Sequence, residues 1–313
     1  MTAGVGGDPG RVPGGDAATV AVLTNPAAGR GRYAGLLPQI LTRLGAAGHP
    51  VHVVQAGSAA EAPTAVRAVV DAGAAAVVAV GGDGTVHLAL QAVAGRGVPF
   101  GVVPAGTGND FATALGLPTD PLAAAGAIAA ALAAGETRPI DAAQVSTPDG
   151  RTRWYAAVLG AGFDAIVNER ANRMRWPRGP LRYDLAIFVE LLRLRARRYT
   201  LRLDGVAYQT GAVLVAVGNT DSYGGGMRIC PAADPTDGLL DIVVAARMGR
   251  LRLLSLKPRL RRGTHVGNRR VSTFRAGTVE IAAAGIVAYA DGERTFALPV
   301  TITCVPGAIR LLG

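Results

Sequence analysis

The stretch AAVVAVGGDGTVHLAL, residues 75–90, decides the fold of this chain. Its first six residues are all apolar, which is typical of a parallel strand buried on both faces of a sheet. The turn GGDGT, residues 81–85, follows at once, and residues 84–94 have the pattern of a helix. A strand, a glycine turn and a helix in succession form the unit of a doubly wound parallel sheet, which binds ligands at the carboxyl ends of its strands.

Similar units flank this stretch. Further strands are expected at 17–25, 50–55 and 98–103, and further helices at 36–44, 59–72 and 121–134. After Asp141 the expected strands follow one another directly, at 153–161, 199–208, 211–218, 238–246, 278–282, 286–290, 294–304 and 307–312. Basic helical stretches interrupt them at 165–176, 181–197 and 249–262.

These patterns predict an α/β fold followed by an all-β fold. An α/β domain with a doubly wound parallel sheet spans residues 17–138, and a mainly antiparallel β domain with basic helical insertions spans 139–313. We leave open that the last strand or so returns to the first domain. Residues 1–16 are rich in glycine and proline and are expected to be a disordered lead-in.

The basic residues are almost all arginine. The chain has 313 residues with 32 Lys plus Arg, and Lys257 is the single lysine. This excludes a phosphate loop of the G-x-x-x-x-G-K-[ST] type and the lysine strand of protein kinases. Any phosphate in this protein must therefore be bound by backbone N–H groups, by arginine or through a metal ion.

The net charge of +10 is unevenly distributed. Residues 170–275 contain about 20 arginines and Lys257 against about seven acids, or roughly +14. Such a segment is either a solvated face or a surface for anionic lipid head groups. Nucleic acid is not expected, because no zinc, helix-turn-helix or RNA-binding signature is present and aromatic residues are few.

Other features of the composition indicate a location. Cys230 and Cys304 do not make a disulfide scaffold, which suggests a reducing compartment. No apolar stretch reaches the ~18 residues of a transmembrane helix, and the N-terminus does not resemble a signal peptide. We expect a cytoplasmic protein that associates peripherally with a membrane. A homodimer is left open.

Three glycine-containing turns follow strands of the first domain, at 25–29, 81–85 and 104–110. Glycine lets the backbone approach a phosphate closely, and the helix after each turn directs N–H groups at an anion. A single turn of this kind is ordinary. Three of them, with Asp83 in the second and Asn109-Asp110 in the third, indicate a phosphate and metal site.

The motifs N-P-x-x-G, G-G-D-G-T and P-x-G-T-x-N-D-F-A resemble the catalytic domain of the bacterial diacylglycerol kinase family, to which sphingosine and ceramide kinases are related. The resemblance covers about residues 19–312 and continues through GAGFD, GN, GGGM, DPTDGLLD and DGE at 160–164, 218–219, 224–227, 234–241 and 291–293. It implies a nucleotide-binding α/β domain followed by a β-sandwich. Enzymes like NAD kinase and phosphofructokinase share the G-G-D-G turn on a related fold.

The resemblance implies a role for each matching residue. Asp83 would lie near a catalytic magnesium ion, with Asp110 and Asp141 as supporting carboxylates. Asp291 would be the general base and Glu293 its support, although an Asp-Gly pair after a strand is by itself an ordinary hairpin turn. ATP would be bound by Asn25, Pro26, Ala27, Ala28, Gly29, Arg30, Gly81, Gly82, Asp83, Gly84, Thr85, Gly106, Thr107 and Asn109. A structural magnesium ion would be bound by Asp234, Asp237 and the carbonyl of Leu239.

The chain departs from the family pattern after G-G-D-G-T, where His87-Leu88 stands in place of Asn-Glu.

We predict an ATP- and Mg²⁺-dependent lipid kinase that phosphorylates diacylglycerol to phosphatidic acid. The alternatives are a kinase of another lipid alcohol, sphingoid-like or glycolipid, then an NAD kinase-like enzyme. The last alternative is an inactive nucleotide- or lipid-binding regulator, for which Leu88 is the hint.

Overall fold

Strand β3, Ala76–Gly81, lies inside a parallel sheet, and all six of its residues are buried. The computed structural model describes residues 18–24, 34–174, 185–186, 189–191, 193 and 195–313. β3 pairs in parallel with β1, Val20–Thr24, on one side and β4, Pro99–Pro104, on the other. β2, Val51–Val53, extends the sheet beyond β1. The apolar run at 75–80 thus forms a strand covered on both faces, as its sequence predicts.

Helices cover both faces of this sheet. On one face α1, Leu37–Gly45, and α5, Pro121–Ala134, enclose a core that includes Val20, Val78 and Ile128. On the other face α2, Ala62–Asp71, and α3, Asp83–Val93, enclose a second core with Val77 and Leu90. A short 3-10 helix, Ala34–Leu36, leads into α1, and α4, Asp110–Ala114, follows β4.

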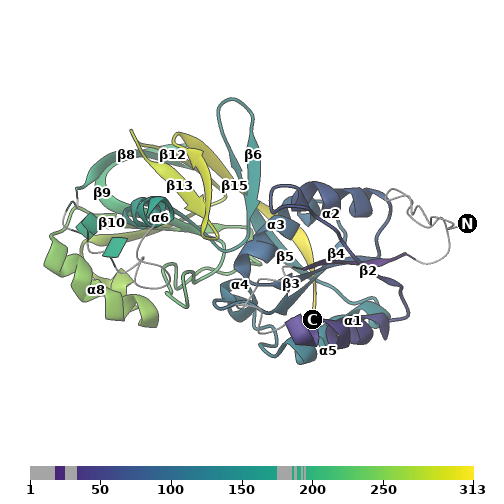
Figure 1. The fold of residues 1–313 in the computed structure, drawn as a ribbon. Helices are drawn as coiled ribbons and strands as arrows, with labels where there is room; N and C mark the ends of the chain where they lie inside the picture. The colour runs from purple at the N-terminus through teal and green to yellow at the C-terminus, as the bar shows by residue number, and fades with distance from the viewer. Residues whose placement is uncertain (1–17, 25–33, 175–184, 187–188, 192, 194) are drawn as a thin grey trace, which may run out of the picture.

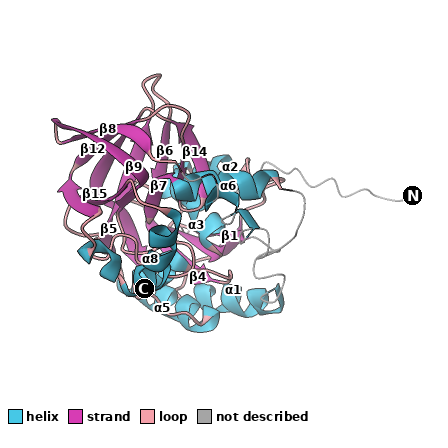
Figure 2. Ribbon diagram, turned by 90° about the vertical axis from the view of Figure 1, so that its left-hand side faces the viewer, coloured by secondary structure: helices cyan, strands magenta, loops and turns pink. Residues whose placement is uncertain are grey.

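The second domain is built from antiparallel strands around its own core. Figure 2 shows β8, β9, β12 and β15 side by side in it, and their pairing is antiparallel throughout. Its helical segments include α6, Phe163–Arg173, α8, Arg250–Arg262, and the 3-10 helix η3, Thr264–Gly267. Its strands are β5 Arg138–Ser146, β6 Thr152–Tyr155, β7 Val158–Gly162, β8 Arg197–Leu203, β9 Val206–Gly218, β10 Leu240–Ala246, β11 Val271–Ala276, β12 Thr278–Ala282, β13 Val287–Ala290, β14 Glu293–Ala297 and β15 Val300–Leu312.

Strand β15 joins the two domains. Its first half pairs with β12 and β5 in the second domain. Its last residues, Arg310–Leu312, pair in parallel with β4, and Leu311 is buried in the core under α3. In Figure 1 this yellow strand crosses from one domain to the other, and the C-terminus lies beside α1 and α5. The expected domain limits stay a prediction, but the chain ends in the first sheet.

The fold class predicted from the sequence is confirmed, but several of the expected elements differ. The strands β5 and β11 were not expected, and the expected strands 199–208 and 211–218 are β8 and β9, which are separated at Asp204 and Gly205. The expected strand 153–161 is two strands, separated at Ala156 and Ala157, whose N–H groups bind a side chain instead of a neighbouring strand. The expected strands 294–304 and 307–312 are replaced by β14, ending at Ala297, and the single long strand β15. Part of the helical stretch expected at 181–197 lies outside the described residues.

Candidate active site

The turn between β3 and α3 is packed tightly against the turn that follows β4. A Cβ atom added to Gly106 would lie 2.4 Å from the Cα of Gly82, a distance that no side chain tolerates. A Cβ on Gly81 would lie 2.3 Å from Oγ1 of Thr85, which is itself buried. Glycine is therefore required so that the two turns can meet, which brings two of the three expected phosphate-binding turns together.

Asn109 shapes the second of these turns. Its backbone is left-handed, with a φ of 55°, and its Oδ1 accepts a 2.9 Å hydrogen bond from the N–H of Gly106. Thr107 and Gly108 between them are exposed. The turn thus presents backbone to solvent at the carboxyl end of β4, where an open parallel sheet binds its ligand.

Asp83 occupies the first turn of α3. Its Oδ1 accepts a 3.1 Å hydrogen bond from the N–H of Phe111 in α4. Burial raises the pKa of this carboxyl above its ordinary value, and the nearby carboxylates Asp110 and Asp291 raise it further, against the opposing effect of the Phe111 hydrogen bond. Negative charge is therefore concentrated at this point, which is suited to a cation.

Asp291 comes from the second domain, at the turn between β13 and β14. Its left-handed backbone, with a φ of 52°, is followed by Gly292. Its Oδ1 accepts a 2.9 Å hydrogen bond from the N–H of Ala157, and its Oδ2 accepts one of 3.1 Å from the N–H of Ala156. The interruption between β6 and β7 thus holds this carboxylate in one orientation.

A partly buried chain of side-chain hydrogen bonds connects Asp291 to the first domain. Gln91 of α3 donates to the carbonyl of Trp154 at 2.8 Å, and its Oε1 accepts from the Trp154 N–H at 2.9 Å. These two bonds determine the orientation of the Gln91 amide, whose NH₂ group lies 3.5 Å from Nε2 of His87. The same NH₂ group also donates to the carbonyl of His87 at 3.1 Å. Because an ionised carboxylate only accepts, Nδ1 of His87 donates to Oδ2 of Asp291 at 3.3 Å.

Two further contacts join the domains around this point. Asp110, at the start of α4, accepts hydrogen bonds of 2.8–3.1 Å from the N–H groups of Gly225 and Gly226. Glu293 of β14 lies beside Gly84, where a Cβ atom would be 3.6 Å from its Oε1. The expected catalytic carboxylates Asp83, Asp291 and Glu293 therefore gather where α3 and α4 meet the second domain.

The segment 234–241, expected to hold a structural magnesium ion, forms a separate turn. Asp234 accepts from the N–H and hydroxyl of Thr236, and Asp237 accepts from the N–H of Leu239 and pairs with Arg275. Arg275 also lies 3.5 Å from Asp241. In the part of the chain that the structure describes, no group of three or more His, Cys, Asp or Glu side chains could hold a metal ion. Arg275 supplies positive charge at this turn, and the metal assignment stays a prediction.

Asp141 contacts the 234–241 turn and β15. It is buried, its Oδ2 accepts a 2.7 Å hydrogen bond from the N–H of Gly238, and its Oδ1 accepts one of 2.8 Å from Gly307. It therefore holds the 234–241 turn against β15. The metal-supporting role expected of it stays a prediction.

The remaining expected site residues are described only in part. Asn25, Pro26, Ala27, Ala28, Gly29 and Arg30 lie outside the described residues. The sequence did not assign a role to Gln91, Trp154 or the Ala156–Ala157 N–H groups. His87 was identified only as a departure from a family pattern, because nothing local shows that a residue 204 positions away is its partner.

Two family models match the chain, one in each domain. The family described as "Diacylglycerol kinase catalytic domain" matches residues 19–145, and the "YegS C-terminal NAD kinase beta sandwich-like domain" matches residues 157–313. A Mycobacterium tuberculosis protein named diacylglycerol kinase is 44% identical over 94% of both chains. A Stenotrophomonas maltophilia protein, named as a YegS-like lipid kinase, is 32% identical over 77% of this chain and 80% of its own.

Solved structures show the same fold. A structure described as a diacylglycerol kinase from Bacillus anthracis superposes with a TM-score of 0.68 at 20% identity, covering 96% of this chain and 98% of that one. An NAD kinase from Archaeoglobus fulgidus, solved in complex with ATP, superposes with a TM-score of 0.52 at 17% identity, covering 94% and 92%.

The fold and the two domain matches define a kinase that phosphorylates an alcohol group. The chain belongs to the diacylglycerol kinase family of lipid kinases. Among the residues that the structure describes, no helix is long and apolar enough to span a bilayer.

Proposed function

We propose that this lipid kinase transfers the γ-phosphate of ATP to the hydroxyl of diacylglycerol, giving phosphatidic acid and ADP, and that it requires Mg²⁺. The observation that carries the proposal is the position of Asp291, a carboxylate of one domain held at the glycine turns of the other. The 44% identity to the protein named diacylglycerol kinase favours diacylglycerol over other lipid alcohols.

Asp291 has the geometry of a general base. As the lipid hydroxyl oxygen bonds to the γ-phosphorus, its proton passes to Asp291, and the bond to the β–γ bridging oxygen breaks to release ADP. A carboxylate has about four lone-pair positions. The N–H groups of Ala156 and Ala157 and the ring of His87 occupy three of these, which leaves one to accept the substrate hydroxyl.

The residues at the start of α3 and α4 suit Mg²⁺. This ion takes carboxylate and water oxygens, and Asp83 and Asp110 supply carboxylates next to the turns that would bind phosphate. The raised pKa of Asp83 means that its negative charge is costly in the protein alone, and a divalent cation would remove that cost. When bound, such an ion would neutralise charge on the β- and γ-phosphates.

The test is transfer of label from the γ-phosphate of ATP, with Mg²⁺ present or chelated, to four acceptors: diacylglycerol, a sphingoid base, a glycolipid and NAD. We expect transfer to diacylglycerol, dependent on Mg²⁺. Asp291→Asn should lower kcat by about a hundredfold to ten-thousandfold, because asparagine keeps the left-handed turn but cannot take the proton.

Asp204→Asn is a matched control. Asp204 also has a positive φ before a glycine, and its carboxylate also accepts two backbone hydrogen bonds, from Gly277 and Thr278. The control should keep full activity with a similar change in thermal stability. Undiminished transfer by the Asp291 variant would overturn the base assignment. Transfer to NAD and to no lipid would overturn the proposed substrate class.

A further inference from the structure

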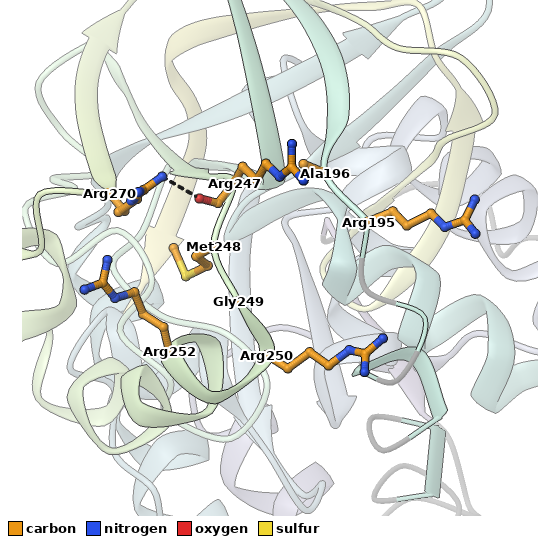
Figure 3. Close-up of a pocket in the computed structure, with 8 residues that line it drawn as sticks. All are labelled: Arg195, Ala196, Arg247, Met248, Gly249, Arg250, Arg252 and Arg270. Carbon is orange, nitrogen blue, oxygen red and sulfur yellow. Dashed lines mark hydrogen bonds between the residues drawn. The ribbon is translucent and has the colours of Figure 1, made fainter.

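An arginine-lined cavity lies in the second domain, outside the site described above. Its volume is about 750 Å³, and we call it the arginine trough. Figure 3 shows its lining side chains around Met248 and Gly249. Five of the eight lining residues are arginine and none is acidic; the eight are Arg195, Ala196, Arg247, Met248, Gly249, Arg250, Arg252 and Arg270.

The arginines of the trough come from three separate segments. Arg195 precedes β8, Arg247 follows β10, and Arg270 precedes β11, while Arg250 and Arg252 belong to the first turn of α8. Tertiary folding therefore gathers positive charge that is dispersed in the sequence. Like charges at close range repel, so such a cluster destabilises the protein unless a bound anion offsets the repulsion.

Four of the five trough arginines lack a carboxylate partner among the described residues. In the described part of the chain, no ion pair with a carboxylate involves Arg195, Arg247, Arg252 or Arg270. Arg270 donates to the carbonyl of Arg247 at 3.0 Å, which orders one guanidinium at the rim without cancelling its charge. Guanidinium groups bind phosphate oxygens in a two-pronged geometry, so a phosphate is the anion that best fits this lining.

The start of α8 adds backbone donors to the trough. Gly249 is the N-cap residue of this 13-residue helix, has no side-chain cap bond, and lines the cavity with Arg250 and Arg252. The first N–H groups of a helix lack intrahelical partners and favour an anion. Backbone and side-chain donors therefore line the same cavity.

Exposed apolar side chains on α8 identify the kind of phosphate. Leu251 is 84% exposed and Leu254 is 44% exposed, and residues three apart lie on one face of a helix. Leu256 of the same helix is buried, so α8 is anchored by one face and presents these two leucines outward. A soluble phosphate ester has no apolar region in which exposed leucines could be buried, whereas a bilayer accepts apolar side chains beneath its phosphate layer.

We propose that the arginine trough binds the phosphate groups of anionic phospholipids, with Leu251 and Leu254 entering the acyl region of the same leaflet. The choice of a lipid surface rests on the proposed function, because a lipid kinase finds its substrate there. The remaining bases of α8, Lys257, Arg259, Arg261 and Arg262, extend the positive surface along the helix.

The trough adjoins elements of the candidate active site. Arg195 and Arg250 also line a second cavity of about 470 Å³, whose wall includes Gly162 at the end of β7. β7 pairs with β13, the strand that ends one residue before Asp291. Docking through the trough would therefore place the second cavity, at the end of β7, next to the lipid surface.

The test is sedimentation of the full chain with vesicles of phosphatidylcholine alone or mixed with phosphatidylglycerol. We expect binding only to the mixed vesicles, and its loss at high salt. The triple variant Arg247→Gln, Arg252→Gln, Arg270→Gln should weaken binding about a hundredfold, since each basic group near an anionic surface contributes about a factor of ten or less. Leu251→Ser with Leu254→Ser should weaken it at unchanged charge.

The control triple variant Arg153→Gln, Arg202→Gln, Arg310→Gln removes the same charge from exposed positions outside the trough. It should retain vesicle binding. Equal loss in both triple variants, or none in the trough variant, would overturn the proposal. So would binding of inorganic phosphate or duplex DNA that depends on the trough arginines while vesicle binding does not.

Kinase activity separates this proposal from the proposed function. With dispersed short-chain diacylglycerol and no vesicles, the trough variants should match the wild type, because none of the substituted residues touches the candidate active site. Vesicle binding by a protein without kinase activity would reject the proposed function and leave the trough assignment standing. Normal kinase activity without vesicle binding would reject the trough assignment and leave the proposed function standing.

Discussion

At the scale of single residues, His87 is the clearest departure of this chain from the family pattern, and the structure explains what it does there. Its ring is buried, with Gln91 on one nitrogen and Asp291 on the other. The hydrogen bond from Nδ1 to Oδ2 orients the carboxylate. His87 is therefore a positioning residue for the proposed base.

His87→Phe should lower kcat by about tenfold to a hundredfold, because it keeps the ring volume but frees the Asp291 carboxylate to rotate. The KM for ATP should change little, since the glycine turns are untouched. The measurement is the steady-state kinetics of this variant. The control is His52→Phe, at an exposed position on β2, which should keep the wild-type kcat. A wild-type kcat in a variant that folds normally would show that His87 does not position the base.

At the scale of elements, η3 contributes a pH-sensitive contact beneath α8. Nε2 of His265 donates to the carbonyl of Ile229 at 3.0 Å, and its Nδ1 is buried with no hydrogen-bond partner among the described residues. Protonation would place a second N–H where nothing accepts it. Burial accordingly lowers the pKa of His265 below its ordinary value of 6.5.

The stability of the protein should fall as the pH drops below 6.5, the ordinary value of this group. In that range the unfolded chain binds the proton and the folded chain does not, so acid favours unfolding by up to about 1.4 kcal/mol per pH unit. His265→Gln can keep the bond to Ile229 but cannot be protonated. Urea unfolding measured at several pH values in this range should show that the free energy of unfolding of that variant changes less with pH than that of the wild type.

His52→Gln, at an exposed position, serves as the control, and its free energy of unfolding should change with pH as that of the wild type does. If His265→Gln and the wild type lose stability in parallel as the pH falls, the acid sensitivity comes from other groups.

At the scale of the whole molecule, β15 makes the two domains depend on each other. The strand begins in the β-sandwich, and its last residues complete the parallel sheet next to β4. Leu311 is 1% exposed and packs in the core between the first sheet and α3, although nearly the whole second domain precedes it in the sequence. The contacts of Asp110 and Asp291 add side-chain links between the same two domains.

Leu311→Ala should lower the free energy of unfolding by about 2–5 kcal/mol, the usual cost of a cavity at a fully buried leucine. Hydrogen exchange should accelerate in β3 and β4, far away in sequence, because β15 shields that edge of the sheet. Leu251→Ala, at an exposed leucine, should change stability by less than about 0.5 kcal/mol. Faster exchange confined to the β-sandwich would contradict the joining role of β15.

The sequence by itself determined the local units and the family. The buried strand 76–81, the glycine turns and the residue types at 83, 109 and 291 follow from periodicity, glycine chemistry and motif order, which are properties of neighbouring residues. It also identified the basic segment, but not which arginines of that segment share a cavity.

Only the tertiary structure decided what these residues do to one another. The bonds from Asp291 to His87 and to Ala156 join positions 204 and 135 residues apart, and those from Asp110 to Gly225 join positions 115 apart. A hydrogen bond depends on a separation of about 3 Å and on direction, which no local pattern specifies. The site is therefore predictable as a set of residue types, while its geometry exists only once β15 and the β13–β14 turn bring the two domains together.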